Sequence, residues 1–450
     1  MYSRLYRLVF IVSIVCWGLC HEMMTAEGCL PSSWIRNPTN HDNTAMGQCM
    51  PSNYKKLREH DIRHRITAML TTMTLRQKVG QVFILAFRKT HNNQPLRVIN
   101  TTVQRHIEQY HPGGIVLFGE NIDTIDQTVT LITDLQASSV LPLFIAVDEE
   151  GGRVSRLNAS GKMHATKLPG NGVLGRTGDT ELSYKTGRFI GQQLMSLGFN
   201  MNFAPVADLN SSSGNSFIGD RSFGDDPDNV GRMVATMVKG MQQQNISSVL
   251  KHFPGHGDTS ADTHKGTVTF EHHYERLRSR ELIPFISGIG AEADGIMTAH
   301  IRLPSVTNGD VPATLSEEIL TDILRDEIGY DGLILTDALE MVAITKYWSP
   351  EEAAVMAFQA GADILLLPPS YERAYNALLN AITDGRITEK RLDESIRRIL
   401  RVKILRDIIS NPGKQNGKRS AASPDEVLGS KQGKDLVDSI VHYSERITEH

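Results

Sequence analysis

A loop rich in ionisable side chains occupies residues 249–268, where the sequence reads VLKHFPGHGDTSADTHKGTV. A short apolar run ends at Lys251 and His252, and proline and glycine residues then break the chain into a loop. Asp262 and His264 are spaced i, i+2, which in an extended chain puts both side chains on one side. A carboxylate beside an imidazole fixes its tautomer and favours the imidazolium, which suits a proton donor near neutral pH. The spacing therefore predicts an Asp–His acid/base pair.

Two other interpretations of this loop stay open. Its histidines and aspartates could hold a metal ion, or they could satisfy buried backbone groups as an ordinary polar loop. The spacing of His252, His256 and His264 gives a metal little support, because Pro254 and Gly255 prevent the helix on which an HxxxH pair would share a face. Since no complete ligand set occurs elsewhere in the sequence, we expect neither a metal nor another cofactor.

The elements that must position these residues are short apolar runs separated by stretches with room for helices. The runs cover residues 82–87, 114–118, 143–147, 200–207, 246–250, 295–299, 332–336 and 363–367. Helical stretches between them include residues 128–135, 182–197, 230–243 and 351–360. Buried strands that alternate with helices predict a parallel sheet, and eight such units predict one closed (β/α)8 TIM-type barrel. A doubly wound open sheet is the alternative.

Polar residues follow five of these runs, at the positions where strands would end. They are Asp148, Asp208, the pair Lys251–His252, His300 and Asp337. Enzymes with this barrel gather their chemistry at the C-terminal ends of the strands, so the pattern predicts an active site there. A structural hydrogen-bonding role is an equally good interpretation for Asp208.

The composition of the sequence and its first residues limit the kinds of partner and location that we expect for the protein. The 450 residues are 40% hydrophobic and 22% charged, with a formal net charge of -4, which predicts a globular protein and no nucleic-acid partner. Residues 1–22 combine a basic start with a short apolar stretch and predict a cleaved signal peptide, with an uncleaved membrane anchor as the alternative. We therefore expect a secreted or lumenal protein without stable membrane association, and a monomer.

The remaining domain predictions follow from cysteine usage and local composition. After signal cleavage Cys29 and Cys49 would remain, and they predict a disulfide in a lead-in over residues 23–52, or else two free thiols. The barrel is expected over residues 53–410. Residues 411–450 are expected to form a linker-like tail with a short helix near its end.

Four segments resemble the sequence motifs of glycoside hydrolase family 3, and specifically its single-domain β-N-acetylglucosaminidase branch. They are VDEEGGRVSR (147–156), IGDRSFGDDP (218–227), KHFPGHGDT with its following DTH (251–264) and LILTDALEM (333–341). The resemblance covers about residues 75–406, which is essentially the whole expected barrel. Larger relatives carry a second domain with a Glu acid/base, whereas a loop-borne DTH supplies that group in this branch.

The resemblance implies a role for each matching residue. Asp148, Arg156, Arg221, Lys251 and His252 are the implied sugar-binding residues, Asp262 and His264 the acid/base dyad, and Asp337 the nucleophile. The implied reaction is exo-hydrolysis, with retention, of a terminal non-reducing β-linked N-acetylglucosamine. Peptidoglycan fragments or chitin oligosaccharides are the implied carbohydrate substrates.

Three other functions remain compatible with the sequence. A substrate-assisted hexosaminidase would use Asp148 and Glu149 as its working pair, with the acetamido group of the substrate as nucleophile. A phosphorylase would gain from a histidine acid/base, because a neutral or cationic group does not repel phosphate. An inactive sugar-binding module is the third possibility, although Asp337, Asp262 and His264 are all present.

Overall fold

The computed structural model describes residues 52–210, 217–257, 268–307, 310–410 and 422–448. The chain divides into two compact units, Met1–Glu59 and His60–His450. Within the first unit, the description covers only the beginning of helix α2 (Ser52–Thr72). The predicted signal peptide, the predicted Cys29–Cys49 disulfide and the Asp262–His264 dyad lie outside the described residues, so these stay predictions.

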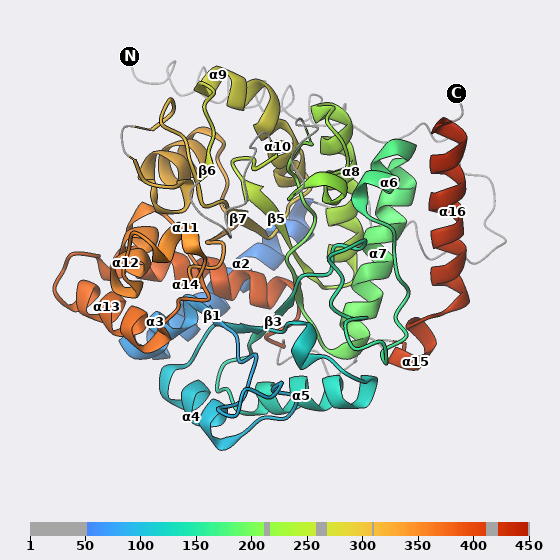
Figure 1. The fold of residues 1–450 in the computed structure, drawn as a ribbon. Coiled ribbons are helices and arrows are strands. Elements are labelled where there is room, and N and C mark those ends of the chain that lie inside the picture. The colour runs from blue at the N-terminus through green and yellow to red at the C-terminus, as the bar shows by residue number, and fades with distance from the viewer. Residues whose placement is uncertain (1–51, 211–216, 258–267, 308–309, 411–421, 449–450) are drawn as a thin grey trace, which may run out of the picture. The chain divides into compact units, whose positions relative to one another are not determined.

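Eight parallel strands form the centre of the second unit (Figure 1). They are β1 (Phe83–Leu85), β2 (Gly114–Val116), β3 (Phe144–Val147), β4 (Met201–Asn202), β5 (Ser247–Phe253), β7 (Gly295–Thr298), β9 (Leu333–Leu335) and β10 (Leu365–Leu366). Their spatial order is β10-β1-β2-β3-β4-β5-β7-β9, so each strand neighbours the next one along the chain. A parallel bridge between Leu335 and Ile364 joins the last two strands. The predicted (β/α)8 barrel is therefore confirmed, and its sequential order differs from that of a doubly wound sheet.

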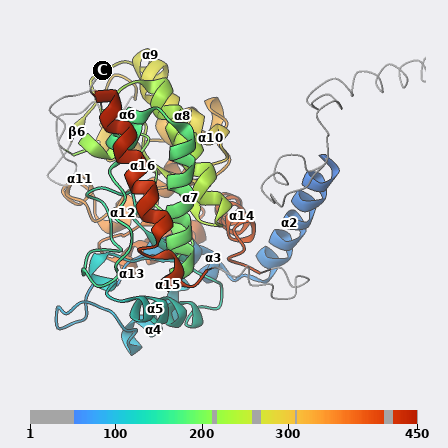
Figure 2. The ribbon, with the colours of Figure 1, turned by 90° about the vertical axis from the view of Figure 1, so that its right-hand side faces the viewer.

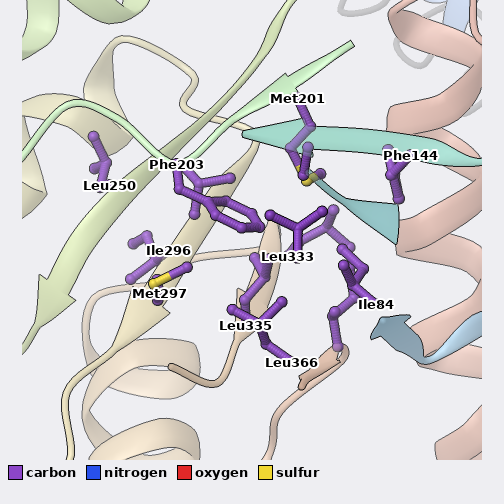
Figure 3. Packing of buried hydrophobic residues seen from close by; sticks show 14 of the residues in the cluster. Ile84, Phe144, Met201, Phe203, Leu250, Ile296, Met297, Leu333, Leu335 and Leu366 are labelled. Atoms are coloured by element: carbon purple, nitrogen blue, oxygen red, sulfur yellow. The ribbon is translucent and has the colours of Figure 1, made fainter. Parts of the chain in front are cut away.

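Apolar side chains in and next to these strands are buried on both faces of the barrel wall (Figure 3). Ile84, Phe144, Phe203, Leu250 and Leu335 are each at most 1% exposed. Parallel strands are covered on both faces, and burying apolar surface contributes about 25 cal/mol per Å². This double burial explains why the strands read as continuous apolar runs in the sequence.

Helices follow most strands and cover the outside of the barrel (Figure 1). The α-helices after α2 are α3 (Leu75–Gln81), α4 (Thr101–Tyr110), α5 (Ile125–Ala137), α6 (Asn171–Thr177), α7 (Thr180–Leu197), α8 (Pro227–Gln243), α9 (Tyr274–Arg276), α10 (Leu282–Gly290), α11 (Val342–Thr345), α12 (Pro350–Ala360), α13 (Tyr371–Thr383), α14 (Glu389–Leu405), α15 (Pro424–Val427) and α16 (Lys431–Thr448). The 3-10 helices are η3 (Gly119–Asn121), η4 (Gly219–Arg221) and η6 (Ala313–Leu315), and the π-helices are η5 (Leu277–Glu281) and η7 (Glu318–Glu327). Among the helices in the described ranges, none has the length and apolar run needed to cross a membrane.

Local signals in the sequence account for several helix boundaries. A capping box stands at the start of α3, with the Thr74 hydroxyl accepting from Gln77 N and the Gln77 side chain accepting from Thr74 N. Such a reciprocal pair satisfies two backbone donors that the first turn leaves open. The last barrel helix, α14, buries the apolar face that its sequence spacing creates, since Ile396, Ile399 and Leu400 are all 0% exposed.

A small second sheet stands at the C-terminal ends of the barrel strands. It pairs β6 (Val268–Thr269) with β8 (Ile301–Arg302), and β8 begins only a few residues after β7 ends. The barrel strands run in the same direction, so their C-terminal ends all face this side of the molecule.

The C-terminal tail differs in part from the expected linker. Residues 424–427 form α15, and α16 begins at Lys431 and lies along α6 and α7 (Figure 2). Ile440 of α16 is 0% exposed, and Arg176 Nε of α6 donates to Ser444 Oγ at 3.2 Å. The tail is thus docked on the barrel helices by an amphipathic face, which the Gly- and Lys-rich composition of this segment did not indicate.

Candidate active site

A pocket of about 430 Å³ opens where the barrel strands end. It brings together all the sequence-predicted site residues that the structure describes: Asp148, Arg156, Arg221, Lys251, His252 and Asp337. We call this hollow the strand-end pocket. Asp262 and His264 lie outside the described residues, so their position relative to the pocket is not described.

Lys251 is the best-buried cation of the pocket. Its ammonium nitrogen donates to Asp148 Oδ1 at 2.6 Å and contacts Glu150 Oε1 at 2.6 Å. The Lys251 and Glu150 side chains are 2% and 1% exposed, whereas the Asp148 side chain is 20% exposed. Asp148 is therefore the more accessible of the two carboxylates, although Glu150 also lines the pocket.

Glu150 also holds Arg221 through a two-point contact. Arg221 Nε donates to Glu150 Oε2 at 2.9 Å, and Arg221 Nη2 donates to Oε1 at 2.8 Å. Burial alone would raise the pKa of Glu150, but the charges of Lys251 and Arg221 outweigh it and hold the pKa at about 2. Glu150 is thus an ionised bridge between two pocket cations.

Glu150 was not predicted as a site residue from the sequence, although it lies inside the VDEEGGRVSR motif. The signal that could have found it is charge pairing. The motif places three carboxylates next to one another, and two cations elsewhere in the recognised motifs need buried anionic partners.

A tight turn after β3 makes this arrangement possible. Gly151 and Gly152 have φ values of 89° and 56°, in the left-handed region that favours glycine. A Cβ atom at Gly152 would lie 2.7 Å from Gly170 Cα, which is closer than real contacts allow. Glu150 N donates to Val154 O at 2.9 Å across the turn, so the chain folds back and returns Arg156 to the pocket.

Strand β5 delivers two consecutive side chains to the same pocket. In a regular strand, neighbours such as Lys251 and His252 would point to opposite faces. Here the pairing of β5 with β7 shifts register between Leu250 and Phe253, and both side chains line the pocket. β-Bulges of this kind re-aim side chains near active sites.

His252 is oriented by a fully buried aspartate. Its Nδ1 lies 2.7 Å from Asp208 Oδ2, and Asp208 Oδ1 accepts from His256 N at 2.7 Å. Burial would raise the pKa of Asp208, but the neighbouring His252 and His256 lower it overall. Since Asp208 is 0% exposed, the carboxylate acts behind the pocket wall, by fixing the His252 ring.

Asp337 lies two residues beyond the end of β9 and lines the pocket. Its Oδ1 accepts a hydrogen bond from Ala338 N at 2.7 Å. His300 supports the same loop, with Nε2 2.9 Å from Ala338 O and Nδ1 2.8 Å from Thr314 Oγ1. His300, which the sequence analysis singled out as a strand ending, is therefore a buried contact of the Asp337 loop.

The two arginines of the VDEEGGRVSR motif take different positions. Arg153 forms an ion pair with Asp220 at 3.1 Å and donates to Ile218 O at 2.9 Å, away from the pocket. Arg156 lines the pocket, and its Nε is buried without a hydrogen-bond acceptor among the described residues. A buried donor of this kind needs a partner, and a ligand oxygen in the pocket would supply one.

The carboxylate of Glu149 is occupied by hydrogen bonds and is not placed for the substrate-assisted reaction that would use it. Its carboxylate accepts from Ser155 Oγ at 2.6 Å, Arg156 N at 2.7 Å and Leu157 N at 3.2 Å. The residue is 5% exposed, and burial raises its pKa. Glu149 thus ties down the turn, and the substrate-assisted pair Asp148–Glu149 gains no support.

The strand-end pocket also has an aromatic wall that was not predicted from the sequence. Phe217 lines the pocket, its ring centroid lies 4.9 Å from that of His256, and Arg221 sits 5.1 Å above it. A flat apolar surface beside hydrogen-bonding groups suits the mixed character of a sugar ring. Among the residues that the structure describes, no group of three or more His, Cys, Asp or Glu side chains is arranged to hold a metal ion.

Residues 74–402 match the model of a family described as "Glycosyl hydrolase family 3 N terminal domain". Beta-hexosaminidase A of Pseudoalteromonas piscicida is 36% identical over 375 residues, which cover 75% of this chain and 62% of that protein. The chain thus spans less than two thirds of the length of that relative. Beta-hexosaminidase LpqI of Mycobacterium tuberculosis is 32% identical over 336 residues, covering 73% of this chain and 82% of that protein.

A solved structure of the same family is also similar to this chain. The glycoside hydrolase family 3 beta-N-acetylglucosaminidase from Paenibacillus sp. is similar with a TM-score of 0.75 and 38% sequence identity. The similarity covers 83% of this chain and 69% of that chain.

Proposed function

Because this chain belongs to glycosyl hydrolase family 3, we propose that it is a retaining exo-β-N-acetylglucosaminidase. Its substrates would carry a terminal non-reducing β-linked N-acetylglucosamine, as in peptidoglycan fragments or chitin oligosaccharides. The hexosaminidase relatives support this sugar preference. The observation that carries the proposal is the convergence of Asp337 with five candidate sugar-binding residues in one pocket at the strand ends.

In the first step, the Asp337 carboxylate would attack the anomeric carbon of the terminal sugar. The bond from that carbon to the leaving oxygen breaks, and His264 donates a proton to this oxygen. The products are a glycosyl ester on Asp337 and the released remainder of the substrate. Asp262 would favour the protonated imidazole that this step requires.

In the second step, His264 would take a proton from water as the water oxygen attacks the anomeric carbon. The ester bond breaks, and Asp337 leaves as a carboxylate. Because each step inverts the configuration, the two steps together retain it. The cycle ends with Asp337 ionised and His264 protonated, ready for the next substrate.

The remaining residues would bind and orient the terminal sugar. Asp148, whose side chain stays 20% exposed, can accept hydrogen bonds from sugar hydroxyls. Arg156 Nε lacks an acceptor among the described residues and can donate to a sugar oxygen. Arg221 and Lys251 are fixed by Glu150, so their positive charges are in place before the substrate arrives.

An activity panel tests the proposal directly. We expect the protein to hydrolyse aryl β-N-acetylglucosaminides in preference to the corresponding β-glucosides and β-xylosides. Product analysis in phosphate buffer should give free N-acetylglucosamine. A preference for glucosides would contradict the assigned sugar, a sugar phosphate would indicate phosphorolysis, and sugar binding without turnover would indicate an inactive module.

A further inference from the structure

Four asparagines of the chain open an Asn-x-Ser/Thr sequence, which is the acceptor sequence for N-linked glycans. They are Asn100, Asn158, Asn210 and Asn245. A secreted protein can be modified at such a sequence, and its folded chain must then leave room for a bulky, polar glycan. The glycan is attached to the side-chain nitrogen, so the surroundings of Nδ2 decide which of these positions suits a glycan.

Asn100 holds its two side-chain amide atoms in different environments. It is the N-cap of α4, and its Oδ1 accepts from Thr102 N at 3.1 Å and from Val103 N at 2.9 Å. Only the oxygen of the amide can accept from these backbone donors, so the orientation of the amide is determined. Nδ2 therefore points away from the start of the helix. It donates no hydrogen bond to a residue that the structure describes and is not buried, so it is accessible to solvent.

The rest of this acceptor sequence also lies at the surface. Thr101 and Thr102 are both exposed, and Val98, just before them, is 67% exposed. Helix α4 lies on the outside of the barrel (Figure 1) and turns its apolar face inward, with Val103 and Ile107 buried. A glycan on Asn100 Nδ2 would extend into solvent and leave that buried face in place.

The cap and the glycan use different atoms of Asn100. N-glycosylation keeps the amide carbonyl, so Oδ1 can still accept from the first turn of α4. An asparagine cap of this kind stabilises the start of a helix. The modified residue would therefore keep its structural role.

Asn158 presents the opposite arrangement. Its Nδ2 donates to Ala165 O at 3.0 Å, and Ala165 is 7% exposed. The hydroxyl of its acceptor sequence is also occupied, because Ser160 Oγ donates to Asp123 O at 2.7 Å and accepts from Lys162 N at 3.2 Å. A glycan on Asn158 would have to turn the amide away from Ala165, so this position is a control for Asn100.

The other two acceptor sequences are less suited or not described. Ser247 supplies the hydroxyl after Asn245, and it is 0% exposed at the start of β5. The two residues after Asn210 lie outside the described residues. Among the acceptor sequences that the structure describes in full, that of Asn100 has both following residues exposed.

We propose that Asn100 carries an N-linked glycan on Nδ2. The donor is an oligosaccharide linked to a lipid diphosphate. A bond forms between Nδ2 and the anomeric carbon of the first sugar, and the bond from that carbon to the diphosphate oxygen breaks. The lipid diphosphate leaves, and Nδ2 loses one of its two protons. The proposal relies on the secretion predicted from residues 1–22 and is independent of the glycosidase assignment, since Asn100 does not line the strand-end pocket.

Mass spectrometry of the full chain, expressed with its own first residues in a eukaryotic cell line, tests this site. N-glycans are released enzymatically in heavy-oxygen water, which converts each glycosylated asparagine into a labelled aspartate. Thr102→Ala removes the hydroxyl of the acceptor sequence but leaves the Asn100 cap, and Thr102→Ser keeps both. Asn158→Gln is the matched control at a second acceptor sequence.

We expect the label at position 100 in wild type, together with a faster-running gel band after glycan release. Thr102→Ala should lose the label at this position, and Thr102→Ser should keep it. Asn158→Gln should leave the mass lost on glycan release unchanged.

Three results would overturn the proposal. The first is an unmodified Asn100 in wild type, whether the protein is secreted or stays in the cytosol. The second is a label at position 100 that persists in Thr102→Ala, because it would report deamidation rather than a glycan. The third is a glycan on Asn158 in place of Asn100, because it would show that the contacts of Nδ2 do not decide the position.

Discussion

Glu150 links the two cations of the strand-end pocket, although its own side chain is 1% exposed. It pairs with Arg221 and Lys251 at 2.8 and 2.6 Å, so it determines where both charges point. A residue of this kind acts through others, and its loss should weaken sugar binding before it affects bond breaking. The role of Glu150 was not predicted from the sequence, because its ion pairs with Arg221 and Lys251 form only in the folded chain.

Glu150→Gln keeps the side-chain volume but removes the charge. We expect KM for an aryl N-acetylglucosaminide to rise about tenfold to a hundredfold, equivalent to about 1.4–2.8 kcal/mol, with a smaller effect on kcat. The inhibition constant of N-acetylglucosamine should rise in parallel, because it reports binding alone. A lower unfolding midpoint with unchanged KM and inhibition constant would mean that Glu150 is only structural.

His264→Ala separates proton transfer from support of the loop. With a sugar leaving group, whose departure needs a proton, the first step should slow by roughly 10²- to 10⁴-fold. With a nitrophenyl leaving group the first step should change far less, while deglycosylation loses its base and the intermediate accumulates. Both kcat and KM should then fall on this substrate, and azide should accelerate turnover. Asp262→Ala should show a milder form of the same pattern.

A different outcome for His264→Ala would contradict its role as the acid/base. Equal losses of kcat/KM on the sugar and nitrophenyl substrates, with no azide effect, would mean that the proton donor is another group. His264 would then only shape the loop.

The docking of helix α16 on the barrel helices depends on one buried face of the helix. Ile440 is 0% exposed and its neighbour Val441 is 36% exposed, so the two residues make a matched pair on one helix. Ile440→Ala should lower the opening free energy of α16 by about 2–4 kcal/mol, from lost burial and a cavity. Val441→Ala should change it by about 0.5 kcal/mol or less.

Native-state hydrogen exchange of the α16 amides measures this opening free energy. The docked position would be contradicted if Ile440→Ala and Val441→Ala reduced amide protection equally. Activity on a small aryl glycoside should be unchanged in both variants, because no residue of α16 lines the strand-end pocket.

The elements also show what could be predicted from the sequence. Seven of the eight apolar runs contain a whole barrel strand and the eighth contains the first part of β5, because buried parallel strands must be apolar. Strand β5 continues beyond the apolar run to Phe253, because a register shift turns Lys251 and His252 into the pocket. The hydrogen bond from Arg88 to Glu340 at the strand-end pocket was not predictable, since the two residues are 252 positions apart in the sequence.

Buried Lys403 makes the free energy of unfolding of the whole protein depend on pH. This lysine of α14 is 0% exposed, and its Nζ donates to Gln81 Oε1 at 2.8 Å and lies 4.9 Å from the Phe144 ring centre. Phe144 begins β3, so the site is at the end of the barrel opposite the strand-end pocket. Burial lowers the pKa of Lys403 from 10.5 to about 7.

The sign of the effect follows from proton binding. Between pH 7 and 10.5 the unfolded chain holds the Lys403 proton more tightly than the folded chain, so the free energy of unfolding rises with pH across this window. Lys403→Met removes this contribution. We expect the free-energy difference, wild type minus variant, to increase by about 2 kcal/mol between pH 7 and pH 9.

Urea unfolding at pH 7, 8 and 9 measures this difference, and other titrating groups cancel in the subtraction. Unfolding free energies that change in parallel for the two proteins would show that Lys403 keeps its charge in the folded state. The substitution should not alter KM, because Lys403 is not among the residues that line the strand-end pocket.

The proposed function depends most on Asp337 acting as the nucleophile of a retaining β-N-acetylglucosaminidase. Its most direct test is to trap the intermediate with an activated fluorinated N-acetylglucosaminyl donor, whose fluorine slows hydrolysis of the glycosyl ester, and to locate the adduct by mass spectrometry of a digest. We expect one sugar per chain on the peptide that contains Asp337, and none in Asp337→Ala. An adduct on another residue, or continued turnover of the donor without any adduct, would contradict it.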